Sequence, residues 1–450
     1  MKKALFIAPA TAVLFTRPAE TAIRLTIGLT PMLVLRPAQL VSVAVTLAAL
    51  ACPVQADYTI TPLFDIANFL NPGSINNLGD ISYVIRSGGE DSIVSTRRGG
   101  PFTTIADTSG AIAPFPIPTP VPSPVPPLPP LPPLRINDSG AVAFRALLDN
   151  GGQAVYSARP GAVTPVVDTS GIFSNFNVFT NINNAGTVLF QATYALGGTA
   201  VLTSTADGII STIADTRSGS YTGLVSPLSN YWGAINTASD VAYTALLPGG
   251  GQAIYVKTAA GALIPIADTS GSFAQLAVAT MNDLGQVVFN VEYKSGGRGI
   301  YVGDGGPLTK IVDASDGFAR LSNPSINNKG AVSFIGGDNA TDEAIYIYVP
   351  GEGVQRVAGT GDSFLGSTVR LPPGGQRSVF YTPYALNDLD EIVLNVYLSD
   401  GREFSALAQP LVVPEPATAS LFTVGMLALG AVVRRRRAPR KNGRREELAR

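Results

Sequence analysis

Short stretches that alternate apolar with small or polar residues run through the middle of the chain and are separated by turn residues. Around Asn137 the candidate stretches are 141–147, 154–156, 163–168 and 173–179, with Gly151-Gly152 and Pro160-Gly161 between them. A period of two that is bounded by glycine and proline is typical of β-strands joined by tight turns. The pattern therefore predicts four short strands in about 46 residues.

This pattern recurs along the chain at nearly fixed offsets. An Asn preceded by Ile, Met or Leu occurs seven times, at Asn76, Asn137, Asn183, Asn236, Asn282, Asn327 and Asn387. Glycine follows three residues later in five copies, with Ser239 and Asp390 in the other two, and an aromatic residue follows seven later in six copies. A second aromatic lies 19 residues after the Asn in four copies. Five copies end in Asp-Thr-Ser-Gly or a variant, which begins at Asp107, Asp168, Asp215, Asp268 and Asp313. Such offsets identify one repeated structural unit.

A β-propeller blade is a sheet of four strands, so a repeat with four strands predicts one blade and seven copies predict seven blades. Successive Asn positions are 61, 46, 53, 46, 45 and 60 residues apart, which predicts insertions in the first, third and sixth units. The seventh unit ends without the Asp-containing segment, whereas Thr61–Asp65 matches Thr164–Asp168 of the second unit. We therefore expect an all-β, seven-bladed propeller over residues 57–412, closed by its own N-terminus. The alternative is an open β-solenoid, whose ends would stay unpaired.

The repeated residues have structural interpretations. Asn with Gly three residues later suits a turn in which the Asn side chain bonds nearby backbone and Gly takes a positive φ. The aromatic residues are expected in the core between blades. The Asp-Thr-Ser-Gly segments are predicted to be Asx turns. The alternative is a ring of calcium-binding carboxylates. Each segment offers one carboxylate where calcium takes several, so no metal site and no cofactor are predicted.

Residues 114–133 contain 12 prolines in 20 positions, which predicts a polyproline II segment that cannot join a sheet. We expect a stiff protruding loop; the alternative is a ligand for a peptide-recognition domain.

The N-terminal 56 residues are expected to be an export signal, with an apolar run from Leu40 to Ala51 and small residues at Val54 and Ala56 before the cleavage site. Mature protein would begin at Asp57. Because the leader is long, Met32 is a candidate for the true start.

The C-terminus combines Val413-Pro414-Glu415-Pro416, an uncharged stretch at 417–433 and Arg434-Arg435-Arg436-Arg437, followed by a basic tail at 438–450. An apolar stretch of this length is at the short limit for a transmembrane helix, and arginines hold that end in the cytoplasm. The order over 413–437 resembles the PEP-CTERM sorting signal. The resemblance implies processing by exosortase in a Gram-negative bacterium that makes exopolysaccharide. The alternative is an ordinary C-terminal membrane anchor.

The repeats resemble a bacterial tandem-repeat family described by an Asn-x-x-Gly-x-x-x-Phe motif, over residues 58–409. That resemblance implies a surface location and no known activity.

Charge and composition narrow the function further. Residues 57–413 carry 17 basic and 28 acidic side chains, a net charge of −11, which disfavours nucleic acid as a partner. The chain has no histidine, which removes histidine-based hydrolases and zinc sites. We expect an exported, non-catalytic protein of the outer surface or extracellular matrix that binds an exopolysaccharide or surface glycan. Signal peptidase, exosortase and, before processing, the inner membrane would be its other partners. The alternative is a glycan hydrolase or lyase that works with carboxylates alone.

Overall fold

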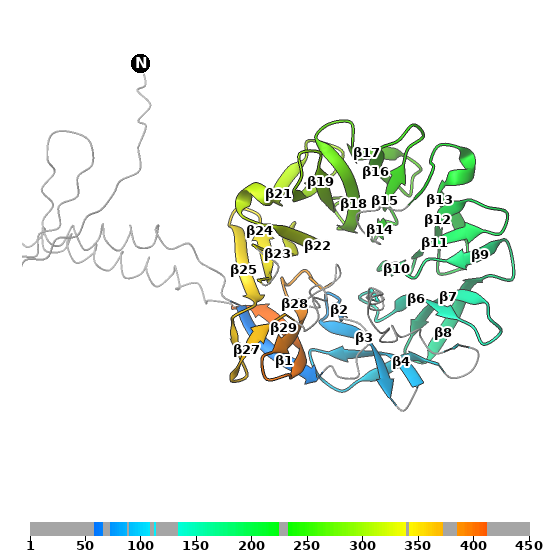
Figure 1. The fold of residues 1–450 in the computed structure, drawn as a ribbon. Helices are drawn as coiled ribbons and strands as arrows, with labels where there is room; N and C mark the ends of the chain where they lie inside the picture. The colour runs from blue at the N-terminus through cyan, green and yellow to red at the C-terminus, as the bar shows by residue number, and fades with distance from the viewer. Residues whose placement is uncertain are drawn as a thin grey trace, which may run out of the picture. The chain divides into compact units, whose positions relative to one another are not determined.

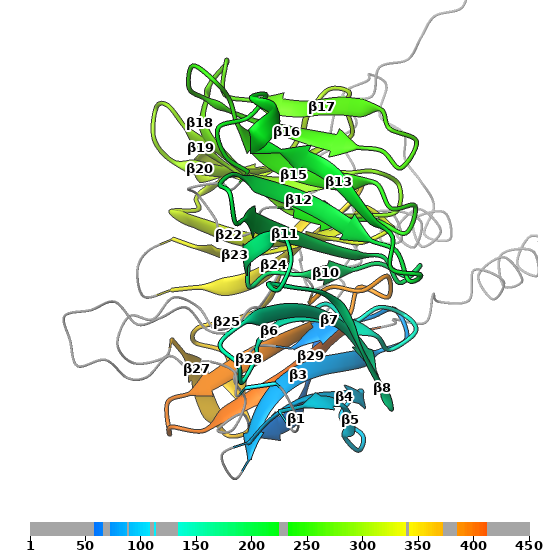
Figure 2. The same ribbon diagram turned by 90° about the vertical axis from the view of Figure 1, so that its right-hand side faces the viewer.

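The computed structural model describes residues 58–65, 73–87, 90–108, 112–113, 134–224, 233–338, 342–371 and 385–411. All of them lie in the second of two compact units, residues 56–450, and everything below concerns that unit. Its strands form seven antiparallel sheets arranged as the blades of a propeller around a common centre (Figure 1), stacked side by side when the ring is seen from its edge (Figure 2). The predicted all-β, seven-bladed fold is confirmed.

In blades 4, 5 and 6 the first strand lies nearest the centre and the fourth lies outside (Figure 1). Blade 1 is β2 (Ser74–Ile75), β3 (Asp80–Ser87), β4 (Glu90–Arg97) and β5 (Thr103–Asp107). Blade 2 is β6 (Val142–Leu147), β7 (Gln153–Arg159) and β8 (Ala162–Asp168), with Ile136 bridged to Val142 on the inner side. Blade 3 is β9 (Phe173–Phe176), β10 (Asn181–Ile182), β11 (Val188–Tyr194), β12 (Thr199–Ser204) and β13 (Ile210–Asp215).

Blade 4 is β14 (Gly233–Ile235), β15 (Val241–Leu246), β16 (Gln252–Lys257) and β17 (Leu263–Asp268). Blade 5 is β18 (Phe273–Met281), β19 (Val287–Tyr293), β20 (Arg298–Gly303) and β21 (Thr309–Asp313). Blade 6 is β22 (Arg320–Ile326), β23 (Val332–Gly337), β24 (Ala344–Val349) and β25 (Gly353–Gly359). Blade 7 is β26 (Ser363–Phe364), β27 (Ser367–Arg370), β28 (Ile392–Leu398), β29 (Glu403–Pro410) and β1 (Tyr58–Asp65). Single turns of 3-10 helix follow blades 3 and 5, at η1 (Thr216–Ser218) and η2 (Ala314–Asp316).

The boundary between blades differs from the boundary between repeats. The sequence pattern grouped 173–179 with the three strands before it. In the structure, β9 and β10 instead pair with β11, which follows them across the Asn183 turn. Each of the first six repeats that begin at an Asn therefore supplies the outer strands of one blade and the innermost segment of the next.

The ring is closed by the two ends of the described propeller. β1 pairs antiparallel with β29 from Tyr58↔Pro410 to Asp65↔Phe404, so the N-terminal strand is the outermost strand of the last blade (Figure 1). Thr61–Asp65 matches Thr164–Asp168 in structure as well as in sequence, because both strands contain a β-bulge at the same position. In every blade the outermost strand skips one branched aliphatic residue in its pairing: Leu63, Ile105, Val166, Ile213, Ile266, Ile311 and Val357.

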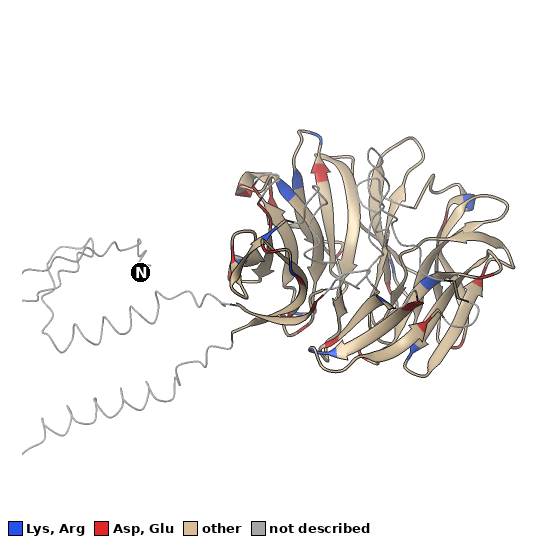
Figure 3. Cartoon of the chain, turned by 60° about the horizontal axis from the view of Figure 1, so that its bottom comes forward, with Lys and Arg blue, Asp and Glu red and all other residues tan. Residues whose placement is uncertain are grey.

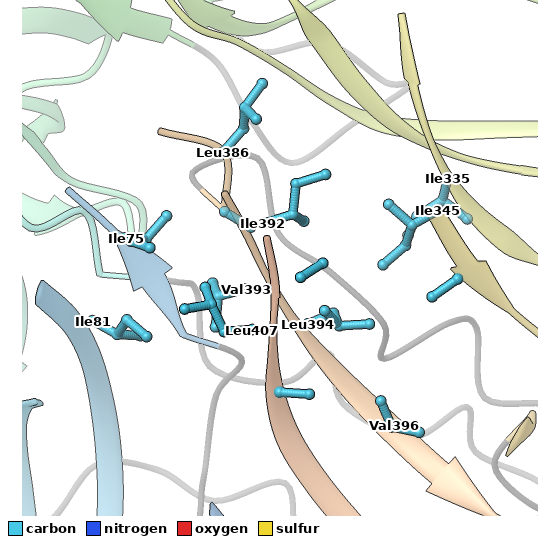
Figure 4. Packing of buried hydrophobic residues seen from close by; sticks show 14 of the residues in the cluster. Ile75, Ile81, Ile335, Ile345, Leu386, Ile392, Val393, Leu394, Val396 and Leu407 are labelled. Carbon is cyan, nitrogen blue, oxygen red and sulfur yellow. The ribbon is translucent and has the colours of Figure 1, made fainter. Parts of the chain in front are cut away.

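The core lies between neighbouring blades. The second and third strands of four blades place two aromatic rings directly opposite each other: Phe144 and Tyr156, Tyr243 and Tyr255, Phe289 and Tyr301, and Phe334 and Tyr346. Their ring centroids are 5.5–6.2 Å apart. At the closure, a cluster joins blades 6, 7 and 1 through Ile345, Leu394 and Ile81 (Figure 4). The predicted aromatic core between blades is confirmed, and the closure is packed as well as hydrogen-bonded.

Candidate functional site

The seven predicted Asn residues form one continuous structural feature. In each turn the Asn Oδ1 accepts backbone N–H groups from the residues that follow; for Asn137 these are Ser139 at 3.1 Å and Ala141 at 2.9 Å. The residue three after the Asn has a positive φ in every copy, 76° at Gly140 and also 67° at Ser239 and 60° at Asp390. The predicted turn chemistry is confirmed, including the two copies that lack glycine.

The same Asn side chains also join the blades. Asn137 Nδ2 donates to the backbone oxygen of Asn183 in the next blade at 2.9 Å. Corresponding bonds of 2.8–3.1 Å run from Asn76 to Asn137, Asn183 to Asn236, Asn282 to Asn327, Asn327 to Asn387, and Asn387 back to Asn76. Because the last of these crosses from blade 7 to blade 1, the bonds continue through the closure.

A second set of bonds runs beside the first and uses the residue after each Asn. Asn77 N donates to Asp138 Oδ1 at 2.9 Å, and Asp388 N donates to Asn77 Oδ1 at the same distance. Between blades 4 and 5, Thr237 N donates to Asp283 Oδ1 at 2.8 Å. Together the two sets connect every pair of neighbouring blades. Sequence reasoning found the Asn positions and missed this second set, although an Asn or Asp follows six of the seven Asn residues.

The predicted Asx turns lie at the ends of the outermost strands. Asp168 Oδ1 accepts the backbone N–H of Ser170 at 2.9 Å, and Asp268 does the same with Ser270 at 2.8 Å. Asp215 and Asp313 cap η1 and η2 in the same way. Hydrogen bonds from the Ser170 hydroxyl and backbone lower the pKa of Asp168. For these four residues the Asx interpretation is confirmed; the segment after Asp107 extends beyond the described residues.

Within the parts of the chain that the structure describes, no three Asp, Glu, His or Cys side chains gather as a metal site would require. The charged positions are few and the two signs are interspersed (Figure 3).

Two faces of the propeller differ in content. The Asn face carries the seven turns that begin at the repeated Asn residues. Both ends of the described propeller lie on it, since the Tyr58 hydroxyl donates to Asp390 O at 3.2 Å and Gln409 Nε2 donates to Glu391 Oε1 at 2.7 Å. The insertion face is the opposite one, at which the outermost strands end. The long connections after β5, β13 and β25 begin there, which places the predicted insertions of the first, third and sixth units on one face.

Acidic residues that depart from the repeat have separate surroundings. Glu343 is 4% exposed, and its Oε1 lies 3.1 Å from Arg320 Nη1, while its Oε2 has no hydrogen-bond partner among the described residues. Glu292 lies opposite Arg298 in blade 5. Glu343 is thus paired with a cation of its own blade, and Glu292 has one as its cross-strand neighbour.

The sorting motif, the arginine cluster, the signal cleavage residues Val54 and Ala56, and the proline segment 114–133 lie outside the described residues. Within the described residues, no helix is long and apolar enough to cross a membrane.

No protein-family model matches the chain, and no curated protein sequence matches it. Among solved structures it is similar to the β-propeller domain of the Trilobed protease from Pyrococcus furiosus, described as having an open velcro topology. The identity is 13%, the coverage 79% of this chain and 98% of that one, and the TM-score 0.48. The BP39L lectin from Burkholderia pseudomallei matches with 12% identity, coverage of 79% and 96%, and a TM-score of 0.43. The acylaminoacyl peptidase of Pyrococcus horikoshii matches with 14% identity, coverage of 78% and 54%, and a TM-score of 0.46. Structural similarity at this low sequence identity says nothing about the activity or the ligand of this chain.

Proposed function

We propose that this chain is an exported, non-catalytic repeat protein of the cell envelope or exopolysaccharide matrix, sorted by exosortase, whose propeller binds a glycan or another surface component. The observation that carries the proposal is the separation of the two faces. Tyr58 and Leu411, where the described propeller begins and ends, lie with the Asn turns, and the long connections begin on the opposite face. A propeller tethered at the Asn face would present the insertion face to its surroundings.

The hydrogen-bonding of the repeated polar residues supports a non-catalytic role. Asn137 and its equivalents bond their own turn and the next blade, and Asp168 and Asp268 bond the backbone of their own turns. Side chains whose oxygen and nitrogen atoms are already hydrogen-bonded within the fold are poor candidates for acid–base chemistry. The repeat is therefore explained by folding.

A carboxylate-based glycan hydrolase or lyase is the second candidate, because Glu343 is buried and has one oxygen without a hydrogen-bond partner. Glycoside cleavage requires two carboxylates at a suitable separation. In the part of the chain that the structure describes, Glu343 is paired with Arg320 rather than with a second acid. This observation favours binding over cleavage.

The test uses the full chain and the 57–412 fragment, which contains every described strand, incubated with the producer's own exopolysaccharide. Co-sedimentation measures binding, and size-exclusion chromatography of the polysaccharide measures chain shortening. We expect co-sedimentation and unchanged chain length. Chain shortening that Glu343→Gln abolishes would replace the proposal with the enzymatic alternative. If the protein neither binds nor shortens the polysaccharide, both candidate functions are rejected.

The sorting part has its own test. The intact mass of protein recovered from culture should place the termini near Asp57 and near Pro414. Protein that still carries residues 434–450 would contradict processing by exosortase.

A further inference from the structure

Arg145 is an exception among the repeated positions. It lies on β6, eight residues after Asn137, and shares a face of the sheet with Ala143 because side chains alternate along a strand. Ala143 packs in the cluster that contains Phe176 and Ile182, so this face looks toward blade 3. The same position is neutral in the other blades: Val84, Gln191, Thr244, Asn290, Ile335 and Asn395.

Two hydrogen bonds hold blade 3 against blade 2 on either side of Arg145. Toward the Asn face, the Thr180 hydroxyl donates to Ala143 O at 2.8 Å. Toward the insertion face, the Phe176 N–H donates to Gln153 Oε1 at 2.9 Å. Between these two points the innermost strand of blade 3 is interrupted, since β9 ends at Phe176 and β10 begins at Asn181. Arg145 thus faces an irregular stretch, 177–180, rather than a continuous strand.

Within the part of the chain that the structure describes, one nitrogen of the Arg145 guanidinium has no acceptor. Its Nε is buried without a hydrogen-bond partner, and burial lowers the pKa of the group with no carboxylate acting against it. Three other arginines of the propeller sheets have acceptors: Arg86 pairs with Asp91, Arg320 with Glu343, and Arg370 Nε donates to Leu398 O at 2.9 Å. Since an arginine stays charged, partial burial without an anion costs stability that a neutral residue would not.

A second cation lies on the same face of blade 2. Ile136 pairs with Val142, so Arg135 is across from Ala143 and diagonal to Arg145, at roughly 7 Å between Cβ atoms for such a pair. Arg135 Nη1 donates to Ile235 O at 2.7 Å, which belongs to blade 4. This side chain therefore reaches from blade 2 to the innermost strand of blade 4, and it starts from the same face of blade 2 as Arg145.

We propose that Arg145, with Arg135 beside it, forms an anion site between blades 2 and 3 that takes the carboxylate of an acidic sugar, such as a uronic acid residue of a polysaccharide. The planar guanidinium matches a carboxylate with paired hydrogen bonds. The stretch that Arg145 faces carries hydroxyl and amide side chains, Thr180 and Asn177, of the kind that bind the hydroxyls of a sugar ring.

The net charge of −11 over residues 57–413 selects among anions. It repels a polymer as densely charged as nucleic acid more strongly than an oligogalacturonate, which carries one carboxylate per sugar ring. This site rests on the proposed function, because it specifies the kind of glycan bound.

The experiment measures binding of an oligogalacturonate to the full chain by calorimetry and by thermal shift, with a neutral oligosaccharide and inorganic phosphate as further arms. The variants are Arg145→Gln and Arg159→Gln; the latter removes the same charge from the exposed end of β7 in the same blade. We expect Arg145→Gln to bind the oligogalacturonate about tenfold or more weakly, as loss of a charged hydrogen bond predicts, and Arg159→Gln to bind as the parent does. Without ligand, Arg145→Met should melt higher than the parent, because an uncompensated charge is gone.

Equal oligogalacturonate affinity for the parent and Arg145→Gln would overturn the site, as would absence of binding by the parent. If inorganic phosphate binds as tightly as the oligogalacturonate, the site binds oxyanions in general, and the proposed specificity for an acidic sugar is rejected. Should Arg145→Gln fail to fold, Arg145→Lys keeps the charge without the planar fork, and unaltered affinity in that variant would likewise reject the paired geometry. If the matrix polysaccharide still binds equally to the parent and Arg145→Gln, the proposed function stands and this site fails. If that polysaccharide does not bind at all, the proposed function fails, and the response to free oligogalacturonate still decides the site.

Discussion

The Asn face and the insertion face are built from the same repeat, yet they differ in uniformity. On the Asn face seven turns repeat the same bonds, down to positive φ values at Ser239 and Asp390 where glycine is absent. On the insertion face the strand connections differ in length from blade to blade, and Glu343 stands where blades 2 and 4 carry Gln153 and Gln252. The comparison teaches that one face closes and stabilises the ring, which leaves the other free to vary without loss of the fold.

Of the changes proposed, the deletion of residues 57–70 should lower the stability of the propeller most, because it removes the strand that closes the ring. It removes β1 and leaves β29 with an unpaired edge at the closure. We expect the truncated protein to aggregate or to melt far below the intact chain, measured by scanning calorimetry and light scattering. A melting temperature close to that of the intact chain would mean that the ring does not depend on its closure, as in a solenoid, where a trimmed end costs little.

Asn137→Ala should have the next largest effect. The side chain is 3% exposed, and its loss leaves the N–H groups of Ser139 and Ala141 and the oxygen of Asn183 without this partner. Stability to urea should fall by roughly 3 kcal/mol. Ser139→Ala, an exposed change in the same turn, is the control; it removes one hydrogen bond, from the Ser139 hydroxyl to Asn137 Oδ1, and should cost about 1 kcal/mol or less. A cost below about 1 kcal/mol for Asn137→Ala would show that the bonds between blades contribute little.

Asp168→Asn tests the turns at the ends of the outer strands, where a smaller and pH-dependent effect is expected. Because the pKa of Asp168 is lowered in the folded protein, the ionised carboxylate contributes stability above the unfolded pKa of about 3.9. That contribution is lost as the pH falls through the folded pKa. The melting temperatures of the parent and the variant should therefore differ at pH 7 and converge near pH 3. Asp149→Asn removes a carboxylate from an exposed turn of the same blade and serves as the charge control. A difference that stays constant from pH 7 to pH 3 would contradict this account.

Removal of the proline segment 114–133 should have the smallest effect. Prolines at this density contribute no ladder hydrogen bonds, and the segment lies between blades 1 and 2 in a connection that begins on the insertion face. We expect the melting temperature to change little, by calorimetry on the full chain. A large loss would place this segment in the core of the fold and remove the distinction between the two faces.

Much of the fold could be predicted because the repeated residues form their turns and strand pairs with residues close to them in the sequence. Asn137 with Gly140 specifies a turn, Asp168 with Ser170 specifies another, and Phe144 with Tyr156 marks two neighbouring strands. The match between Thr61–Asp65 and Thr164–Asp168 was sufficient to predict closure, which β1 and β29 confirm. The grouping of residues 173–179 was wrong, because a strand pattern does not say on which side its partner lies.

The sequence by itself determined the number of blades, the turns and the closing strand, since each depends on residues close together in the chain or on a motif that repeats. The tertiary structure alone decided that Asn137 bonds Asn183, 46 residues away, and that Arg145 faces an interrupted strand of the next blade with one guanidinium nitrogen lacking an acceptor among the described residues. Contacts of this kind depend on how neighbouring sheets pack and how their strands are phased. Hydrophobic periodicity reports which side chains are buried, and it carries no information about which blade they meet.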